Sequence, residues 1–162
     1  MSLRKHFLRN LFLLILALPL GASAAPLYRM TLLPQDFNAT ALDERGRVVG
    51  SAQGGLAVWA PAATAYYGAL LPGAEALATS RSGASIVGLA GPSAFVFGNG
   101  AFSTVGLPAP ATWATAVNDA GQVAGFASYG FGQSSAFLYQ AGAFVELGTL
   151  GGDVSVANAI NA

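Results

Sequence analysis

The sequence predicts an all-β fold of tandem four-stranded repeats, an incomplete β-propeller-like array that follows an N-terminal signal helix. A short motif recurs every 37 to 43 residues, which fits one four-stranded unit of about 40 residues. The 21 glycines, the 54% of hydrophobic residues and the 9% of charged residues favour short strands and tight turns over helices or disorder. The first two dozen residues have the composition of an export signal.

The N-terminal segment is predicted to be a cleaved signal peptide over residues 1–24. A positively charged segment precedes the uncharged apolar run Leu11 to Leu20, and Ala22-Ser23-Ala24 offers small residues where a signal peptidase cuts. The rival interpretation is a membrane anchor, but a spanning helix needs about 20 apolar residues. We therefore expect a secreted or periplasmic mature chain, residues 25–162, with no stable membrane anchor after cleavage.

Cleavage would also remove the only lysine and the only histidine, Lys5 and His6, from a chain that has no cysteine. The mature chain then carries four arginines against seven carboxylates, a net charge of −3, so a nucleic-acid partner has no electrostatic basis. Without His, Cys or Lys, neither a conventional nucleophile–base pair nor a thiolate or imidazole metal site can be built. The sequence therefore predicts no catalytic residue, no metal site and no cofactor.

Each repeat begins with a strand of small residues that runs into a polar turn closed by glycine. The three copies are Ala39 to Gly46, Ala76 to Gly83 and Ala114 to Gly121, and a fourth begins at Ala157. Asp, Asn or Ser at the first turn position can hydrogen-bond its own backbone, and glycine accepts a positive φ. These residues predict a hairpin turn after each first strand.

The other three strands of each repeat are predicted from the hydrophobic segments that follow. Second strands are expected at Arg47 to Gly50, Ser85 to Gly88 and Gln122 to Gly125. Third strands carry a recurring aromatic position, namely Trp59, Phe97 and Tyr139. Fourth strands are expected at Tyr66 to Leu71, Phe102 to Leu107 and Phe144 to about Thr149, with Tyr28, Tyr66, Phe102 and Phe144 at one position. Recurring aromatic positions predict packing between sheets.

The β-repeat domain is expected to cover residues 25–162. Its predicted parts are a partial repeat at 26–36, full repeats at 37–73, 74–110 and 111–152, and a partial repeat at 153–162. Tyr28 to Pro34 matches a fourth strand and Ala157 to Asn161 a first strand, which gives fourteen strands. Three explanations remain open: an open array that self-associates through exposed sheet edges, ends completed by a second chain, or a truncated fragment, which we favour.

Four segments resemble the motifs of a known family. They are Leu147 to Gly152, Ala159 to Asn161, Gly121 to Gly125 and Ala136 to Tyr139. On these residues, the chain from Tyr28 to its end resembles the bacterial extracellular HAF repeat family. The resemblance implies an exported β-propeller-like repeat with no established activity. The histidine that names the family is absent, because Ser93 and Ser135 stand at its place and Leu56 in the first copy, so no role is carried over for it.

Carboxylates are the remaining candidates for chemistry. Asp43 and Asp119 could in principle form the carboxylate pair of a glycoside hydrolase. Each lies in the polar turn before a repeat glycine, however, where we expect it to cap the turn. Calcium at Asp153 or at the Asn118-Asp119 turn is disfavoured, because no copy concentrates the several acids that a tight site needs.

The aromatic residues that do not recur are the candidate ligand contacts. Trp113, Tyr129 and Phe131 have no counterparts, and the last two lie in Ala127 to Ser135, the longest such segment of the three copies. We expect an enlarged loop in which Tyr129, Phe131 and Gln133 contact a sugar or a peptide. The alternative is a tolerated insertion whose aromatic rings fold back over the core.

These observations predict an exported, non-catalytic repeat protein that acts as a binding or scaffolding module in the envelope or outside the cell. Its partner would be an extracellular glycan or protein that the sequence does not identify. The alternatives are a carboxylate-based hydrolase of extracellular glycans and a truncated remnant of a longer repeat protein.

Overall fold

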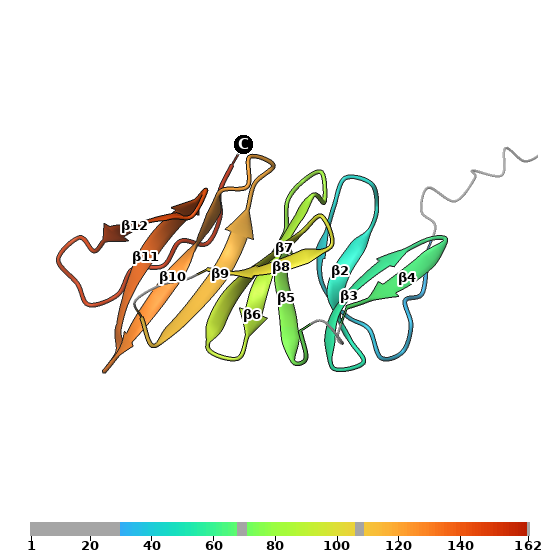
Figure 1. Cartoon of the computed structure of the whole chain (residues 1–162), viewed down its shortest axis with the longest axis horizontal. Helices are drawn as coiled ribbons and strands as arrows, with labels where there is room; N and C mark the ends of the chain where they lie inside the picture. Colours follow the sequence, from blue (N-terminus) through green and yellow to red (C-terminus); the bar gives the residue numbers. More distant parts are fainter. Residues whose placement is uncertain (1–29, 68–70, 106–108, 162) are drawn as a thin grey trace, which may run out of the picture. The chain divides into compact units, whose positions relative to one another are not determined.

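The computed structural model describes residues 30–67, 71–105 and 109–161 (Figure 1). The predicted signal helix lies outside the described residues. Every strand of the described residues belongs to one compact unit, Leu33–Ala162. In the part of the chain that is described, we find no helix with the length and apolarity needed to cross a membrane.

The all-β prediction is confirmed, because the described residues form twelve strands in three four-stranded antiparallel sheets in tandem (Figure 1). Sheet 1 contains β1 (Asn38–Leu42), β2 (Val48–Ala52), β3 (Gly55–Ala60) and β4 (Ala63–Tyr66). Sheet 2 contains β5 (Ala74–Thr79), β6 (Ser85–Ala90), β7 (Ser93–Gly98) and β8 (Ala101–Thr104). Sheet 3 contains β9 (Ala111–Val117), β10 (Val123–Gly130), β11 (Gln133–Gln140) and β12 (Ala143–Gly148). Consecutive strands pair in every sheet, as they do in a propeller blade.

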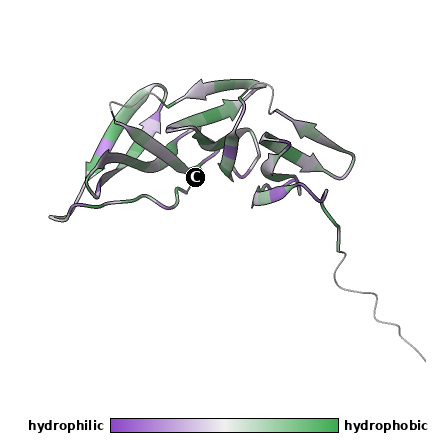
Figure 2. Ribbon diagram, turned by 90° about the horizontal axis from the view of Figure 1, so that it is seen from below, coloured by the Kyte–Doolittle hydropathy of each residue, from purple (hydrophilic) through white to green (hydrophobic). Residues whose placement is uncertain are grey.

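The hydrophobic core lies between neighbouring sheets, and sheet 2 is buried on both faces. Successive residues of a strand point to opposite faces of the sheet. Ile86 and Phe95 therefore pack against sheet 1, whereas Val87 and Ala94 pack against sheet 3. Figure 2 shows hydrophobic residues along the strands of all three sheets. Full burial of a side chain such as Phe95 stabilises the fold by about 1.5–3 kcal/mol.

The glycine of each second strand lies within the strand rather than at its end. Gly50, Gly88 and Gly125 are each followed by further paired residues of β2, β6 and β10. The facing strand has a register shift beside each of these glycines, which brings a carbonyl oxygen against the glycine Cα. A side chain has no room at this position, so the recurring glycine is explained by the close approach of two backbones.

Strand register corrects two alignments made from the sequence. The Ala52–Gly55 and Ala90–Ser93 hairpins have equal length, so Gly55, and not Leu56, occupies the position of Ser93. In the fourth strands, Thr64 pairs with the third-strand aromatic residue, as Phe102 and Phe144 do. Tyr66 therefore does not share the position of Phe102 and Phe144.

The expected count of fourteen strands is wrong for the described residues. No strand is present at residues 30–37, while Tyr28 and Arg29 lie outside the described residues. Residues 153–161 form only an isolated bridge, Ser134 with Val154. This segment nevertheless contacts sheet 3, because Thr115 Oγ1 donates to the carbonyl of Ala157 at 2.5 Å. Apart from that bridge, no strand among the described residues pairs with this segment, so it does not extend a sheet.

Candidate functional site

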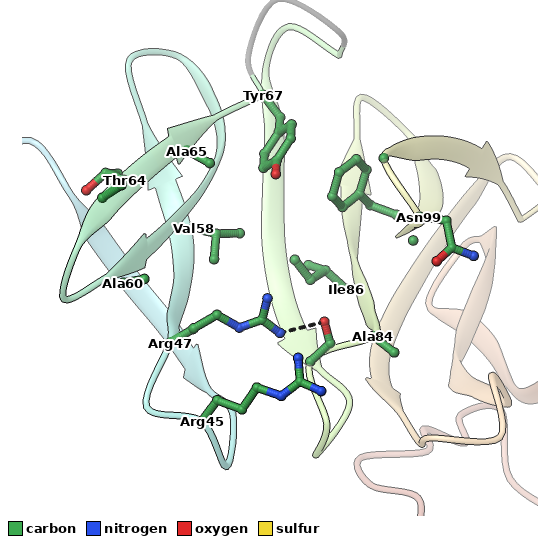
Figure 3. Close-up of a pocket in the computed structure, with 15 residues that line it drawn as sticks. Arg45, Arg47, Val58, Ala60, Thr64, Ala65, Tyr67, Ala84, Ile86 and Asn99 are labelled. Carbon is green, nitrogen blue, oxygen red and sulfur yellow. Dashed lines mark hydrogen bonds between the residues drawn. The ribbon is translucent and has the colours of Figure 1, made fainter.

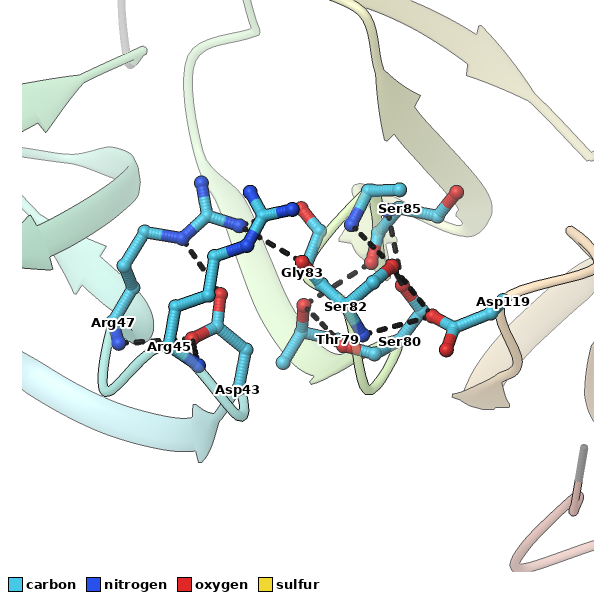
Figure 4. Close-up of polar contacts among 10 residues, drawn as sticks. Asp43, Arg45, Arg47, Thr79, Ser80, Ser82, Gly83, Ser85 and Asp119 are labelled. Carbon is cyan, nitrogen blue, oxygen red and sulfur yellow. Dashed lines mark hydrogen bonds and ion pairs between the residues drawn. The ribbon is translucent and has the colours of Figure 1, made fainter.

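Polar turns at the ends of β1, β5 and β9 connect neighbouring sheets (Figure 4). In the first turn, Asp43 accepts hydrogen bonds from the backbone N–H groups of Arg45 and Arg47, both at 2.9 Å. The guanidinium Nε of Arg47 donates to the second carboxylate oxygen at 2.6 Å. The predicted capping role of Asp43 is therefore confirmed, and an ion pair is added to it.

The environment of Asp43 keeps its carboxylate charged. Burial alone raises the pKa of Asp43, but the hydrogen bonds from Arg47 and Arg45 and the charge of Arg47 outweigh it and lower the pKa below its ordinary value of 3.8. The side chain is 0% exposed. Both oxygens are occupied and shielded, so this carboxylate has no access to a substrate.

Arg47 also ties the first turn to sheet 2. One of its terminal nitrogens donates to the carbonyl of Gly83 at 2.9 Å and lies 3.4 Å from that of Ser82 (Figure 4). The Asp43–Arg47 pair is therefore part of a link between two sheets.

Asp119 has a different role from the one predicted. It does not cap its own turn, which Asn118 caps by accepting from the N–H groups of Ala120 and Gln122. Asp119 instead accepts from the backbone and hydroxyl of Ser82 in sheet 2, at 2.8 and 2.6 Å. These two bonds lower the pKa of Asp119. Both candidate catalytic carboxylates thus hold turns or sheets together.

A groove of about 450 Å³ lies between sheets 1 and 2 (Figure 3). Its lining includes Val58 and Ala65 on the sheet 1 side, and Ile86 and Phe97 on the sheet 2 side. The ring of Tyr67 also lines the groove and packs on Phe97, with 4.6 Å between the ring centroids. This volume is within the range of about 300–1,000 Å³ that small-ligand sites occupy.

Several polar side chains at the groove have no partner among the described residues, and three of them carry the argument. These groups are the guanidinium of Arg45, the hydroxyl of Tyr67 and the amide of Asn99, for which no side-chain hydrogen bond or ion pair is found within that part of the chain. Figure 3 shows Arg45 and Arg47 reaching from the first turn toward sheet 2, and the Tyr67 hydroxyl pointing down toward them. The groove therefore combines an apolar lining with a few converging polar groups, as ligand sites do.

The polar lining is specific to this pair of sheets. The turn glycines Gly46, Gly83 and Gly121 correspond, so Ser82 and Ala120 stand where sheet 1 has Arg45. Tyr67 and Val105 correspond as well, because each donates its N–H to the start of the third strand, at Leu56 and Ala94.

Sequence reasoning missed this groove, although the sequence contains one signal of it. Arg45 and Arg47 flank the same turn glycine, Gly46, in a chain whose expected mature part has only four arginines. The contributions of Tyr67 and Asn99 could not be found in the same way, because these residues line the same groove as Arg45 only when sheets 1 and 2 pack together.

The four predicted ligand residues all lie in sheet 3, but the structure does not bring them together. Trp113 of β9 stacks on Phe126 of β10, with ring centroids 4.8 Å apart and an interplanar angle of 7°. Tyr129 packs half-buried against the core between sheets 2 and 3. Phe126 precedes core-facing Ala127, so the Trp113–Phe126 stack lies on the opposite face from Tyr129.

The predicted enlarged loop at Ala127 to Ser135 is wrong. The added residues lengthen the two strands, so β10 continues to Gly130 and β11 begins at Gln133. Only Phe131 and Gly132 remain as a turn, with positive φ angles of 52° and 80° that match a type I′ hairpin. Phe131 is fully exposed at this tip, and Gln133 is exposed beside it.

Within the described residues, no three or more His, Cys, Asp or Glu side chains lie close enough together to hold a metal ion. Comparisons with protein-family models, curated proteins and solved structures found no match to this chain.

Proposed function

We propose that this chain is an exported, non-catalytic module that binds a ligand in the groove between sheets 1 and 2. The observation that carries the proposal is the convergence of Arg45, Tyr67 and Asn99, which have no partner among the described residues, on an apolar groove. Fully buried side-chain polar atoms in the described chain are all hydrogen-bonded. Polar groups left open around a concavity are available to a ligand.

The absence of catalysis is supported by the state of the carboxylates. A carboxylate-based hydrolase needs one group that donates a proton and another that attacks or activates water. Asp43 is shielded and ion-paired, and Asp119 is held by Ser82. The alternative of a glycan hydrolase therefore has no favourable geometry at the two residues that first suggested it.

Export and membership of the HAF repeat family remain part of this proposal. They rest on the signal-like N-terminus and on motifs such as Gly121 to Gly125 and Leu147 to Gly152. The three blade-like sheets agree with the β-propeller-like repeat that the resemblance implies. The partner would then be a glycan or protein of the envelope or the extracellular space.

The hairpin tip of sheet 3 is the second candidate contact. Phe131 is 106% exposed at the tip of the β10–β11 hairpin, so its aromatic ring is available to stack on a partner. Gln133 lies beside it, whereas Tyr129 and Trp113 are engaged in packing within the sheet array.

A glycan array probed with the mature chain, residues 25–162, tests the proposed function. We expect binding of a glycan that remains uncleaved, with binding reduced at least about tenfold by Tyr67→Ala, because the ring lines the groove. Phe131→Ser is the matched variant for the hairpin tip and is expected to retain groove binding. Cleavage of a bound glycan would contradict the non-catalytic assignment, and binding lost only in Phe131→Ser would move the site to the tip.

A further inference from the structure

We infer that the groove between sheets 1 and 2 recognises a carboxylate-bearing sugar, a hexuronate, with the carboxylate bound by Arg45. This inference rests on the proposed function and adds the chemical class of the ligand. It follows from the charges around Arg45, from the polar groups on the other side of the groove, and from the apolar surfaces between them.

The positive charge of Arg45 is not neutralised by its neighbours. Asp43 pairs with Arg47 at 2.6 Å, and Glu44 pairs with Arg81 at 2.9 Å. These two pairs use both acids of the turn, and no ion pair to Arg45 occurs within the described ranges. An exposed guanidinium offers a planar set of donors that matches a carboxylate in a bidentate arrangement. A negatively charged ligand therefore complements this end of the groove.

The other side of the groove offers groups that suit a sugar ring. The Tyr67 hydroxyl points toward the two arginines, and the Asn99 amide lies at the edge formed by the β7–β8 turn (Figure 3). Each can both donate to and accept from a sugar hydroxyl. Val58 and Ile86 provide the apolar surface that the C–H face of a pyranose requires. A uronate has a carboxylate, an apolar ring face and hydroxyl groups, and the groove offers a partner for each of them.

Other anionic ligands fit less well. A free phosphate would use only the arginine end and leave the apolar lining of a 450 Å³ groove without a function. A peptide that adds to a sheet pairs with the backbone of a free strand edge, here β4, and this mode of binding does not use the charge of Arg45.

Calorimetric titration of the mature chain with trigalacturonate and with its neutral methyl ester tests this inference. We expect the acid to bind at least about tenfold more tightly than the ester, because charge-assisted hydrogen bonds are about twice as strong as neutral ones. Arg45→Gln should weaken acid binding by at least about tenfold and ester binding by a clearly smaller factor, because the neutral ester forms no charge-assisted pair with the guanidinium, and Arg45→Lys should bind the acid with intermediate affinity.

Two further variants separate the contribution of the Tyr67 hydroxyl from that of the charge of Arg45. Tyr67→Phe keeps the ring that packs on Phe97 but removes the hydroxyl, so we expect acid and ester binding to fall by the same factor, about threefold. The double variant Glu44→Gln/Arg81→Gln is the control, because it removes an exposed ion pair that does not line the groove and leaves no free carboxylate beside Arg45. It should leave both affinities unchanged.

Equal binding of acid and ester, or acid binding that survives Arg45→Gln, would overturn the carboxylate assignment. A neutral glycan whose binding depends on Tyr67 but not on Arg45 would overturn it too, while leaving the proposed binding function intact. Tighter binding of a short peptide with a free C-terminal carboxylate would overturn the sugar assignment. Failure to bind any array glycan, either trisaccharide or the peptide would overturn both proposals.

Discussion

Replacing Gly88 by alanine is expected to destabilise the fold by about 3 kcal/mol or more. The new Cβ would collide with the backbone carbonyl oxygen of Glu75 on the neighbouring strand β5. That oxygen belongs to a paired strand with a register shift at this point, so it cannot move without disrupting hydrogen bonds of sheet 2. The midpoint of urea unfolding of the mature chain measures the loss.

Gly152→Ala provides the matched control for Gly88→Ala. A Cβ at position 152 would meet no heavy atom within 4 Å, and Gly152 is not among the glycines with positive φ. We therefore expect a change within about 0.5 kcal/mol. Equal unfolding midpoints for the two variants would show that the close approach of β5 and β6 is not as described.

Replacing Asp43 by alanine is expected to cost about 3 kcal/mol, because it leaves Arg47 without its partner and two backbone N–H groups without their acceptor. This is near the lower end of the range for a broken buried ion pair, since Arg47 is 32% exposed. Asp43→Asn should cost less, about 1–2 kcal/mol. Asparagine can still cap the turn, as Asn118 does at the corresponding position of sheet 3.

The pH dependence of this effect has a definite sign. The pKa of Asp43 is lower in the folded state than its ordinary 3.8, so its charge stabilises the fold above that value. The stability difference between the wild type and Asp43→Asn should be largest near neutral pH and should shrink as the pH falls below 3.8 through the folded-state pKa. Asp153→Asn is the control, because this exposed side chain forms no hydrogen bond or ion pair among the described residues. A difference that stays constant down to low pH would contradict the role given to the Asp43 charge.

The fold could be predicted from the sequence because its signals are local and repeat. The turn glycines and the acceptors before them, such as Asp43 and Asn118, set hairpins at a regular spacing, and the hydrophobic segments between them supply the strands. The ends of the strands were harder to predict from the sequence. The sequence pattern places the recurring Gly88 at the end of a strand, whereas this glycine marks a close approach that depends on the facing strand β5.

The candidate site could not be predicted in the same way. Residues without counterparts in other repeats were the correct kind of signal, but Trp113 and Tyr129 are packed within the sheet array. Tyr67 also lacks an aromatic counterpart, since Val105 stands at its position, but alignment of the repeats by sequence places its neighbour Tyr66 with the recurring aromatic residues. The contact of Tyr67 with Phe97 exists only when two sheets pack together.

The central claim is that ligand recognition takes place between sheets 1 and 2. Two-dimensional ¹H–¹⁵N spectra of the mature chain during titration with trigalacturonate test it most directly. We expect the Arg45 side-chain Nε–H signal and the backbone signals of Tyr67 and Asn99 to shift together and to saturate. Shifts concentrated on Phe131 and Gln133 at the tip of sheet 3, with the Arg45 signal unmoved, would contradict the claim.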